Sequence, residues 1–156
     1  TCAKMNPPLR TWKDVQAIKD GLRDGTIDAI ATDHAPHASQ EKQLGFTEAP
    51  FGIVGLETAL PLTFALVDEG VLSLEAAVDK LSTAPAKAFG LAKGTLAVGA
   101  DADVAIVDQQ EQWEVDPAKF RSKSRNTPFA GWKVKGRVTT TIVGGRVVFE
   151  AAKAEQ

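Results

Sequence analysis

A short apolar run that ends in an acid and two histidines constrains the fold of this chain most. Residues 27–32 are too few for a helix and suit a buried strand, and Asp33, His34 and His37 follow them at once. Residues 12–24 have helical spacing and precede the run, so the two segments form half of an α/β unit. A strand that ends in a carboxylate and a tight turn is typical of the mouth of a barrel of parallel strands, where side chains meet a ligand.

Helical patterns continue to about residue 90. Residues 56–68 carry apolar side chains along one side, and Pro61 inside this segment should bend the helix or leave one carbonyl unpaired. Ser73 predicts the cap of the next helix, and Pro85 opens a last short turn. Residues 34–52 have no sustained period, and a loop of this length favours a functional role.

The pattern changes to strands after Gly94. The segments that favour strands are residues 104–107, 113–115, 138–143 and 147–149. Gly144 and Gly145 lie between the last two and predict a two-residue hairpin. We therefore expect two domains, residues 1–92 and residues 93–156.

Composition excludes several classes of protein. The 156 residues are 44% hydrophobic and 24% charged, which is ordinary for a globular protein. The net charge of −2 and the lack of a basic block argue against a nucleic-acid partner, and no apolar run approaches the roughly 20 residues of a membrane span. Cys2 is the one cysteine, so no internal disulfide forms, and a reducing, cytoplasmic location is expected.

Asp33 and the two histidines are the first candidates for chemistry. From the residue alone, Asp33 is either an N-cap for the following turn or a metal ligand and proton carrier. Asp33, His34 and His37 give at most three donors and are not a complete zinc site. We interpret His34 as a hydrogen-bonded structural residue, and His37 as a residue that faces a ligand and could hold a carboxylate.

Two further places could contact a ligand. Asn6 precedes two prolines, so it is either a turn residue or an amide that reads a ligand's carbonyl and N–H together. Gly52 after Phe51 lets the backbone approach a ligand, although the pair could also be simply a loop entering a helix. The basic run at residues 119–125 is interpreted as a solvated surface.

Three segments together resemble bacterial dihydroorotase of the longer type, in the amidohydrolase superfamily. They are residues 4–10 (KMNPPLR), 31–37 (ATDHAPH) and 49–58 (APFGIVGLET). Residues 99–108 (GADADVAIVD) resemble the small β-domain that many amidohydrolases share, and residues 126–129 and 136–149 also fit the dihydroorotase C-terminus.

The resemblance implies the fold and the roles of the candidates. The expected fold is α/β: the C-terminal part of a (β/α)8 metal-dependent barrel, with its last strand and flanking helices, plus a small β-sandwich-type domain. The implied reaction is the zinc-dependent, reversible cyclisation of N-carbamoyl-L-aspartate to L-dihydroorotate in pyrimidine biosynthesis. Asp33 matches the acid that ligates zinc and carries the proton, and Asn6 and His37 match substrate-binding residues. Phe51 and Gly52 match a backbone contact to the substrate ring.

The resemblance also implies that this chain is the last third or so of a longer enzyme. The family's other zinc ligands, for one or two ions, would lie upstream of Thr1, so the isolated chain is expected to be inactive without the N-terminal part of the barrel. The expected partners are a small-molecule substrate and a second copy of the enzyme, with aspartate carbamoyltransferase as a further candidate. The alternatives are another cyclic-amide hydrolase, of hydantoinase or allantoinase type, and a non-catalytic partner subunit of aspartate carbamoyltransferase.

Overall fold

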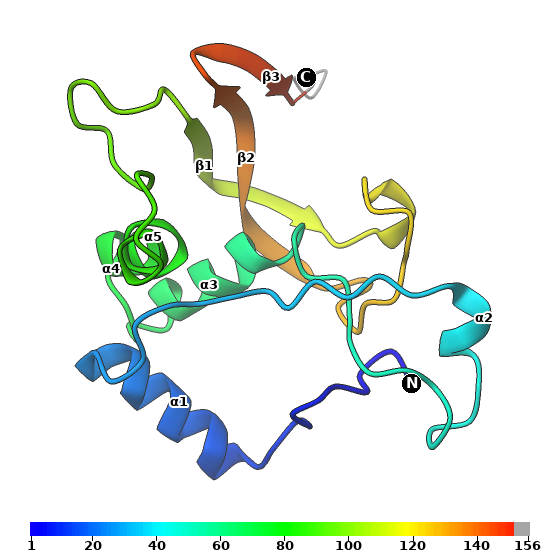
Figure 1. The fold of residues 1–156 in the computed structure, drawn as a ribbon. Helices are drawn as coiled ribbons and strands as arrows, with labels where there is room; N and C mark the ends of the chain where they lie inside the picture. Colours follow the sequence, from blue (N-terminus) through cyan, green and yellow to red (C-terminus); the bar gives the residue numbers. More distant parts are fainter. Residues whose placement is uncertain (152–156) are drawn as a thin grey trace.

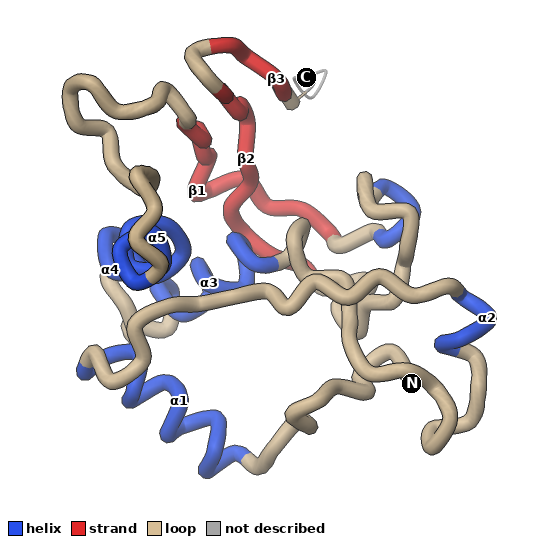
Figure 2. Tube along the Cα trace, in the orientation of Figure 1, coloured by secondary structure: helices blue, strands red, loops and turns tan. Residues whose placement is uncertain are grey.

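The computed structural model describes residues 1–151, in which helices come first and a three-stranded sheet follows (Figure 1). Long irregular segments connect the helices and approach the sheet, as the tube in Figure 2 shows. No helix in residues 1–151 has the length and apolar character that crossing a membrane requires.

The first helix is confirmed with its predicted bounds. Helix α1 spans Trp12–Asp24, and Gly25 ends it in a left-handed conformation. The Thr11 hydroxyl accepts a hydrogen bond from the N–H of Asp14, while the Asp14 carboxylate accepts one from the N–H of Thr11. The hydrogen bonds from Thr11 lower the pKa of Asp14. Local sequence therefore suffices to place this helix.

The prediction of a strand at residues 27–32 is wrong for the described structure. The segment is extended but belongs to no sheet, and its side chains are half-buried or exposed rather than buried. Its contacts run to a helical neighbour: Ile30 N–H donates to the carbonyl of Lys80, and the Lys80 ammonium donates to the carbonyl of Ile27 at 2.5 Å. A strand needs regular hydrogen bonds to a parallel or antiparallel neighbour. A helix cannot supply these bonds, so the segment stays irregular.

The second long helix begins three residues later than expected. Helix α3 spans Ala59–Asp68, after the short helix α2 at Ser39–Lys42. Pro61 therefore lies in the first turn of α3, where the missing N–H has no helical partner to lose. The interior position that the prediction of a bend or an unpaired carbonyl assumed for Pro61 is therefore wrong.

The cap at Ser73 is confirmed, but the helix after it is longer than expected. Helix α4, Leu74–Val78, begins where the Ser73 hydroxyl accepts a hydrogen bond from Ala76 N–H at 3.1 Å. It continues through a π-helical turn, Asp79–Thr83, into α5, Ala84–Ala88. Pro85 sits in the first turn of α5 rather than opening a separate turn.

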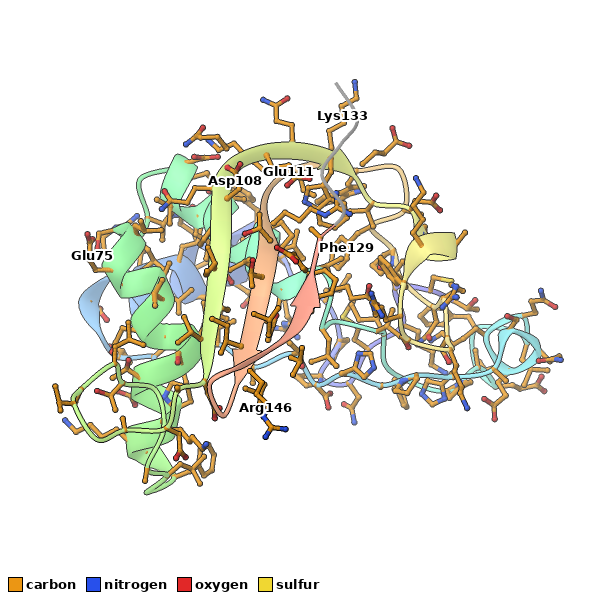
Figure 3. All side chains as sticks on the ribbon, turned by 90° about the horizontal axis from the view of Figure 1, so that it is seen from above. Glu75, Asp108, Glu111, Phe129, Lys133 and Arg146 are labelled. Carbon is orange, nitrogen blue, oxygen red and sulfur yellow. The ribbon has the colours of Figure 1, made fainter. Side chains whose placement is uncertain are left out.

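The sheet is antiparallel with strand order β1-β2-β3. Strand β1 is Val104–Glu114, β2 is Lys133–Val143 and β3 is Arg146–Glu150, and a 3-10 turn at Pro117–Lys119 follows β1. The hairpin between β2 and β3 is confirmed, whereas the two strands expected at 104–107 and 113–115 are parts of β1. Figure 3 shows the sheet with Asp108 and Glu111 on β1 and Arg146 at the hairpin. Residues 1–151 thus contain one three-stranded sheet, and the second sheet of the expected sandwich is not formed by the described residues.

Two buried clusters hold the elements together. Leu22, Val71, Leu72 and Ala77 pack where α1 meets the start of α4. The second cluster consists of Val54, from the loop before α3, with Val115 and Phe120, from the segment after β1. This second cluster joins the loop before α3 to the segment after β1, and it lies close in sequence to the candidate residues Phe51 and Gly52.

Candidate functional site

Backbone hydrogen bonds bring three distant segments together. His34 forms an isolated parallel bridge with Ile53, and Ala35 N–H donates to the Ile53 carbonyl at 2.8 Å. Gly52 N–H donates to the carbonyl of Lys4 at 2.9 Å, so the first residues run beside the segment between α2 and α3 (Figure 1). Residues 4–6, 33–37 and 51–53 therefore form one group, which we call the loop cluster.

Asp33 is exposed and has an unusual backbone. Its φ of 43° is the one positive value among the non-glycine residues at positions 1–151. Such conformations cost energy and are found preferentially at functional sites, although aspartate tolerates them better than most residues. The helix that follows begins at Ser39 with Ala38 at its N-cap, so Asp33 does not cap a helix. Asp33 is exposed to solvent, and none of the residues 27–32 before it is fully buried.

His37 contacts Phe51 directly. Its Nε2 lies 2.9 Å from the Phe51 carbonyl oxygen, which can only accept, so Nε2 carries the hydrogen. Its Nδ1 lies 3.7 Å from a carboxylate oxygen of the exposed Glu41. The structure thus joins two of the predicted substrate-binding residues. Asn6 is exposed and follows Lys4 by two positions at the edge of the loop cluster.

His34 makes the contacts of a structural residue. Its Nδ1 accepts a hydrogen bond from Gly55 N–H at 3.1 Å and a longer one from Leu56 N–H at 3.4 Å. These bonds hold the loop that leads into α3, in agreement with the structural interpretation of this histidine.

Gly52 is required by packing inside the cluster. Its φ is 110°, and a Cβ added to it would lie 2.4 Å from the Cβ of Ala35. The close approach is therefore to the protein's own segment at 33–37. Phe51 beside it is exposed, and the ammonium of Lys4 lies 4.5 Å from the centre of its ring.

Two buried lysines, which sequence reasoning missed, fix the loop that ends in Phe51 and Gly52. The Lys4 ammonium donates to the carbonyl of Ala49 at 2.5 Å, and the Lys42 ammonium donates to the carbonyls of Pro50 at 2.8 Å and Gly52 at 3.1 Å. Both side chains are buried among these carbonyl oxygens. Nothing in the local pattern around either lysine indicates burial, because the acceptors are backbone groups of an irregular loop.

Asn126 is a third buried residue that sequence reasoning did not single out. Its side chain bonds to Ala35, His37 and Gly52 of the loop cluster. The signal that could have drawn attention to it is its place at the head of the motif at residues 126–129.

The described residues do not by themselves form a metal site. Residues 1–151 contain no group of three or more His, Cys, Asp or Glu side chains that could hold an ion. Asp33 offers one hard oxygen ligand, and a single carboxylate falls short of the three or four ligands of zinc sites. A groove of about 1190 Å³ lies elsewhere, between the start of α3 and the sheet.

Comparisons with known proteins agree with one another on the family. A family model described as "Amidohydrolase family" matches residues 5–148. A protein named dihydroorotase from Geobacter metallireducens is 58% identical over 150 residues, which are 96% of this chain and 35% of that protein. The chain thus spans about a third of the length of the curated relatives it matches.

Solved structures give the same fold. The L-hydantoinase (dihydropyrimidinase) from Arthrobacter aurescens matches 94% of this chain and 34% of its own, with a TM-score of 0.87 and 39% identity. The dihydropyrimidinase from Brevibacillus agri matches 95% of this chain and 34% of its own, with a TM-score of 0.89 and 32% identity. The arrangement of helices and sheet described above is thus shared with part of a larger α/β fold.

Proposed function

The chain belongs to the amidohydrolase family, and we propose that it forms the C-terminal part of a dihydroorotase. One observation carries the proposal: three segments that resemble dihydroorotase lie far apart in the sequence and are gathered by hydrogen bonds into the loop cluster. The similarity to proteins named dihydroorotase supports it, since these are 52–58% identical to nearly the whole chain.

The whole protein would be a (β/α)8 barrel with a smaller β-domain. Residues 1–92 would contribute the extended segment at 27–32, whose neighbours would lie in the rest of the barrel, and its flanking helices, while residues 93–156 would form part of the β-domain. Large apolar side chains support this, because Trp12, Phe89 and Leu96 are 72%, 79% and 81% exposed. Single exposed apolar side chains are common on protein surfaces. The many large ones here suggest that further parts of the protein cover them.

Asp33 would carry the proton in this reaction. In the ring-opening direction, water adds to the ring amide carbon, the C–N bond breaks, and a proton moves from the attacking water to the leaving nitrogen. An exposed carboxylate held at a fixed place on the loop can accept that proton and return it. His37 and Asn6 would hold the substrate carboxylate, and the backbone at Phe51 and Gly52 would face the ring.

Zinc is part of the proposal, with Asp33 as the ligand that this chain offers. The described residues do not complete such a site, so the other ligands would come from the N-terminal part of the barrel. A cytoplasmic homo-oligomer, with aspartate carbamoyltransferase as a candidate partner, completes the proposal.

The alternatives receive less support. The hydantoinases and dihydropyrimidinases that share the fold are 25–39% identical to this chain, less than the dihydroorotases. A non-catalytic subunit would have no need of Asp33, His37 and Asn6 in their family positions.

The test uses the full natural protein that carries this sequence. Purified protein should convert L-dihydroorotate and N-carbamoyl-L-aspartate into each other, should contain zinc, and should prefer these substrates to an uncharged hydantoin. The 156-residue chain alone should show no turnover. Preference for hydantoin would favour the hydantoinase alternative, and zinc-dependent turnover by the chain alone would contradict the proposed fragment.

A further inference from the structure

We infer that Asn126 is a positioning residue for the candidate substrate-binding residues, an inference that rests on the proposed function. Its side-chain amide joins the segment that carries His37 to the segment that carries Phe51 and Gly52. Asn126 lies on neither segment, and the separation in sequence is 89 residues from His37 and 74 from Gly52.

The hydrogen bonds of Asn126 use both ends of its amide. Nδ2 donates to the carbonyl of Ala35 at 2.9 Å and to the carbonyl of Gly52 at 3.3 Å, while Oδ1 accepts from His37 N–H at 3.3 Å. Carbonyls only accept and an amide N–H only donates, so these three partners fix which way the side chain points. The side chain is only 5% exposed, so water cannot readily replace the bonds.

The backbone of Asn126 is anchored independently. Its carbonyl accepts a hydrogen bond from Val54 N–H at 3.0 Å, and Val54 packs against Val115 and Phe120. Gly52 is also held from the other side, because the Lys42 ammonium donates to the same carbonyl oxygen. The amide of Asn126 thus links the loop cluster to the buried cluster of Val54, Val115 and Phe120.

The consequence is a fixed relation between His37 and Phe51. His37 Nε2 lies 2.9 Å from the Phe51 carbonyl only while both segments keep their separation. The Asn126 side chain bonds to the backbone of His37 and to the backbone of Gly52, the residue next to Phe51. It touches neither the substrate nor Asp33 in the proposed mechanism, so its removal should impair substrate binding more than the proton transfer.

The first experiment measures kinetics in the full natural protein. Asn126→Ala should raise KM for L-dihydroorotate roughly 10-fold, the effect of losing about one good hydrogen bond, with a much smaller change in kcat. Thr63→Val is the matched control, because Thr63 is also buried and donates to the Ala59 carbonyl at 2.8 Å, within α3. This control should leave KM unchanged. If Asn126→Ala lowers only the amount of active enzyme and leaves KM unchanged, the inference is overturned.

A second readout does not depend on activity. Amide hydrogen exchange in Asn126→Ala should quicken at His37 and Gly52 while α1 keeps the exchange rates of the parent protein. A uniform increase along the chain would mean a general loss of stability and would overturn the inference. Asn126→Ser, which keeps a small donor in the same space, should give the same local change if the alanine variant does not fold.

The two proposals fail in different ways. If the parent protein does not turn over L-dihydroorotate, the proposed function fails, and the exchange pattern alone then decides whether Asn126 positions the loop cluster. If the parent is active and exchange changes only at the cluster while KM stays constant, the positioning role fails and the proposed function stands.

Discussion

The backbone N–H of Gly55 donates a hydrogen bond to Nδ1 of His34, with 3.1 Å between the two nitrogens. The bond joins the 33–37 segment of the loop cluster to the loop that leads into α3. Because Nδ1 accepts, the hydrogen of the neutral ring lies on Nε2. Of the two histidines in the chain, this one supports the loop, and only His37 contacts a predicted substrate-binding residue.

Replacement of His34 should reveal this structural role. His34→Ala leaves the half-buried N–H of Gly55 without its partner and should lower the free energy of unfolding by about 1–3 kcal/mol. His34→Asn places an amide oxygen near the position of Nδ1 and should recover most of that loss. Urea unfolding measures both. Equal losses in the two variants would show that the packing of the ring, and not the bond, stabilises the loop.

Gly52→Ala should destabilise the protein more than an equivalent change elsewhere. Gly25 also has a positive φ, 86°, but has no atom within 4 Å of an added Cβ, so Gly25→Ala measures backbone strain alone, about 1–2 kcal/mol. At Gly52 the added Cβ meets Ala35 at 2.4 Å, which should cost about 1–3 kcal/mol more. Thermal unfolding compares the stabilities of Gly52→Ala and Gly25→Ala. Equal losses of stability would show that the segments of Gly52 and Ala35 can move apart without an energetic cost.

Lys42→Met should loosen the loop that ends in Phe51 and Gly52. Methionine nearly matches the length of lysine but donates no hydrogen bond, so the carbonyls of Pro50 and Gly52 lose their ammonium partner. The expected loss is about 1–3 kcal/mol, with faster proteolysis in this loop. Lys13→Met, on the exposed face of α1, is the control and should stay within about 0.5 kcal/mol of the parent. The same loss in both variants would contradict the buried role of Lys42.

Stability should fall in acid, in part through Asp103. Hydrogen bonds from the Lys93 ammonium and from Gly144 N–H lower the pKa of Asp103 below its ordinary value of 3.8. A lowered pKa in the folded state stabilises the protein above the unfolded pKa, and that contribution is lost as pH falls through the folded pKa. The midpoint of urea unfolding should therefore drop as the pH falls from about 5 to below 3.8. Asp103→Asn should reduce this drop without abolishing it, because Asp14 and Asp24 also have lowered pKa values. A drop unchanged in this variant would contradict the contribution of Asp103.

The parts of the fold that local sequence determines were predicted well. Thr11 and Gly25 bound α1, and the two glycines at 144 and 145 place the hairpin, since caps and tight turns depend on a few adjacent residues. Residues 27–32 were predicted wrongly because a strand depends on partners far away in sequence. The pattern there is typical of a parallel strand, but this chain offers a helix beside it.

The candidate site divides in the same way. Asp33, His37, Phe51 and Gly52 could be singled out from the sequence. Hydrogen bonds join the segments of His37, Phe51 and Gly52, while Asp33 and Asn6 lie near these bonds in the sequence. The residues that hold the cluster could not be found, because Lys42 and Asn126 bind backbone carbonyls whose positions exist only in the folded loop. The positions of these carbonyl oxygens depend on the folded path of the loop, which no local sequence pattern specifies.

The most direct test of the central claim is the turnover of L-dihydroorotate by Asp33→Asn in the full natural protein. Asparagine keeps the size of the side chain but cannot carry the proton, so kcat should fall by roughly 10²–10⁴-fold while the substrate still binds. His34→Asn, measured beside it, should keep a kcat close to that of the parent. A kcat in Asp33→Asn within a few-fold of the parent would contradict the assignment of this loop cluster as a dihydroorotase site.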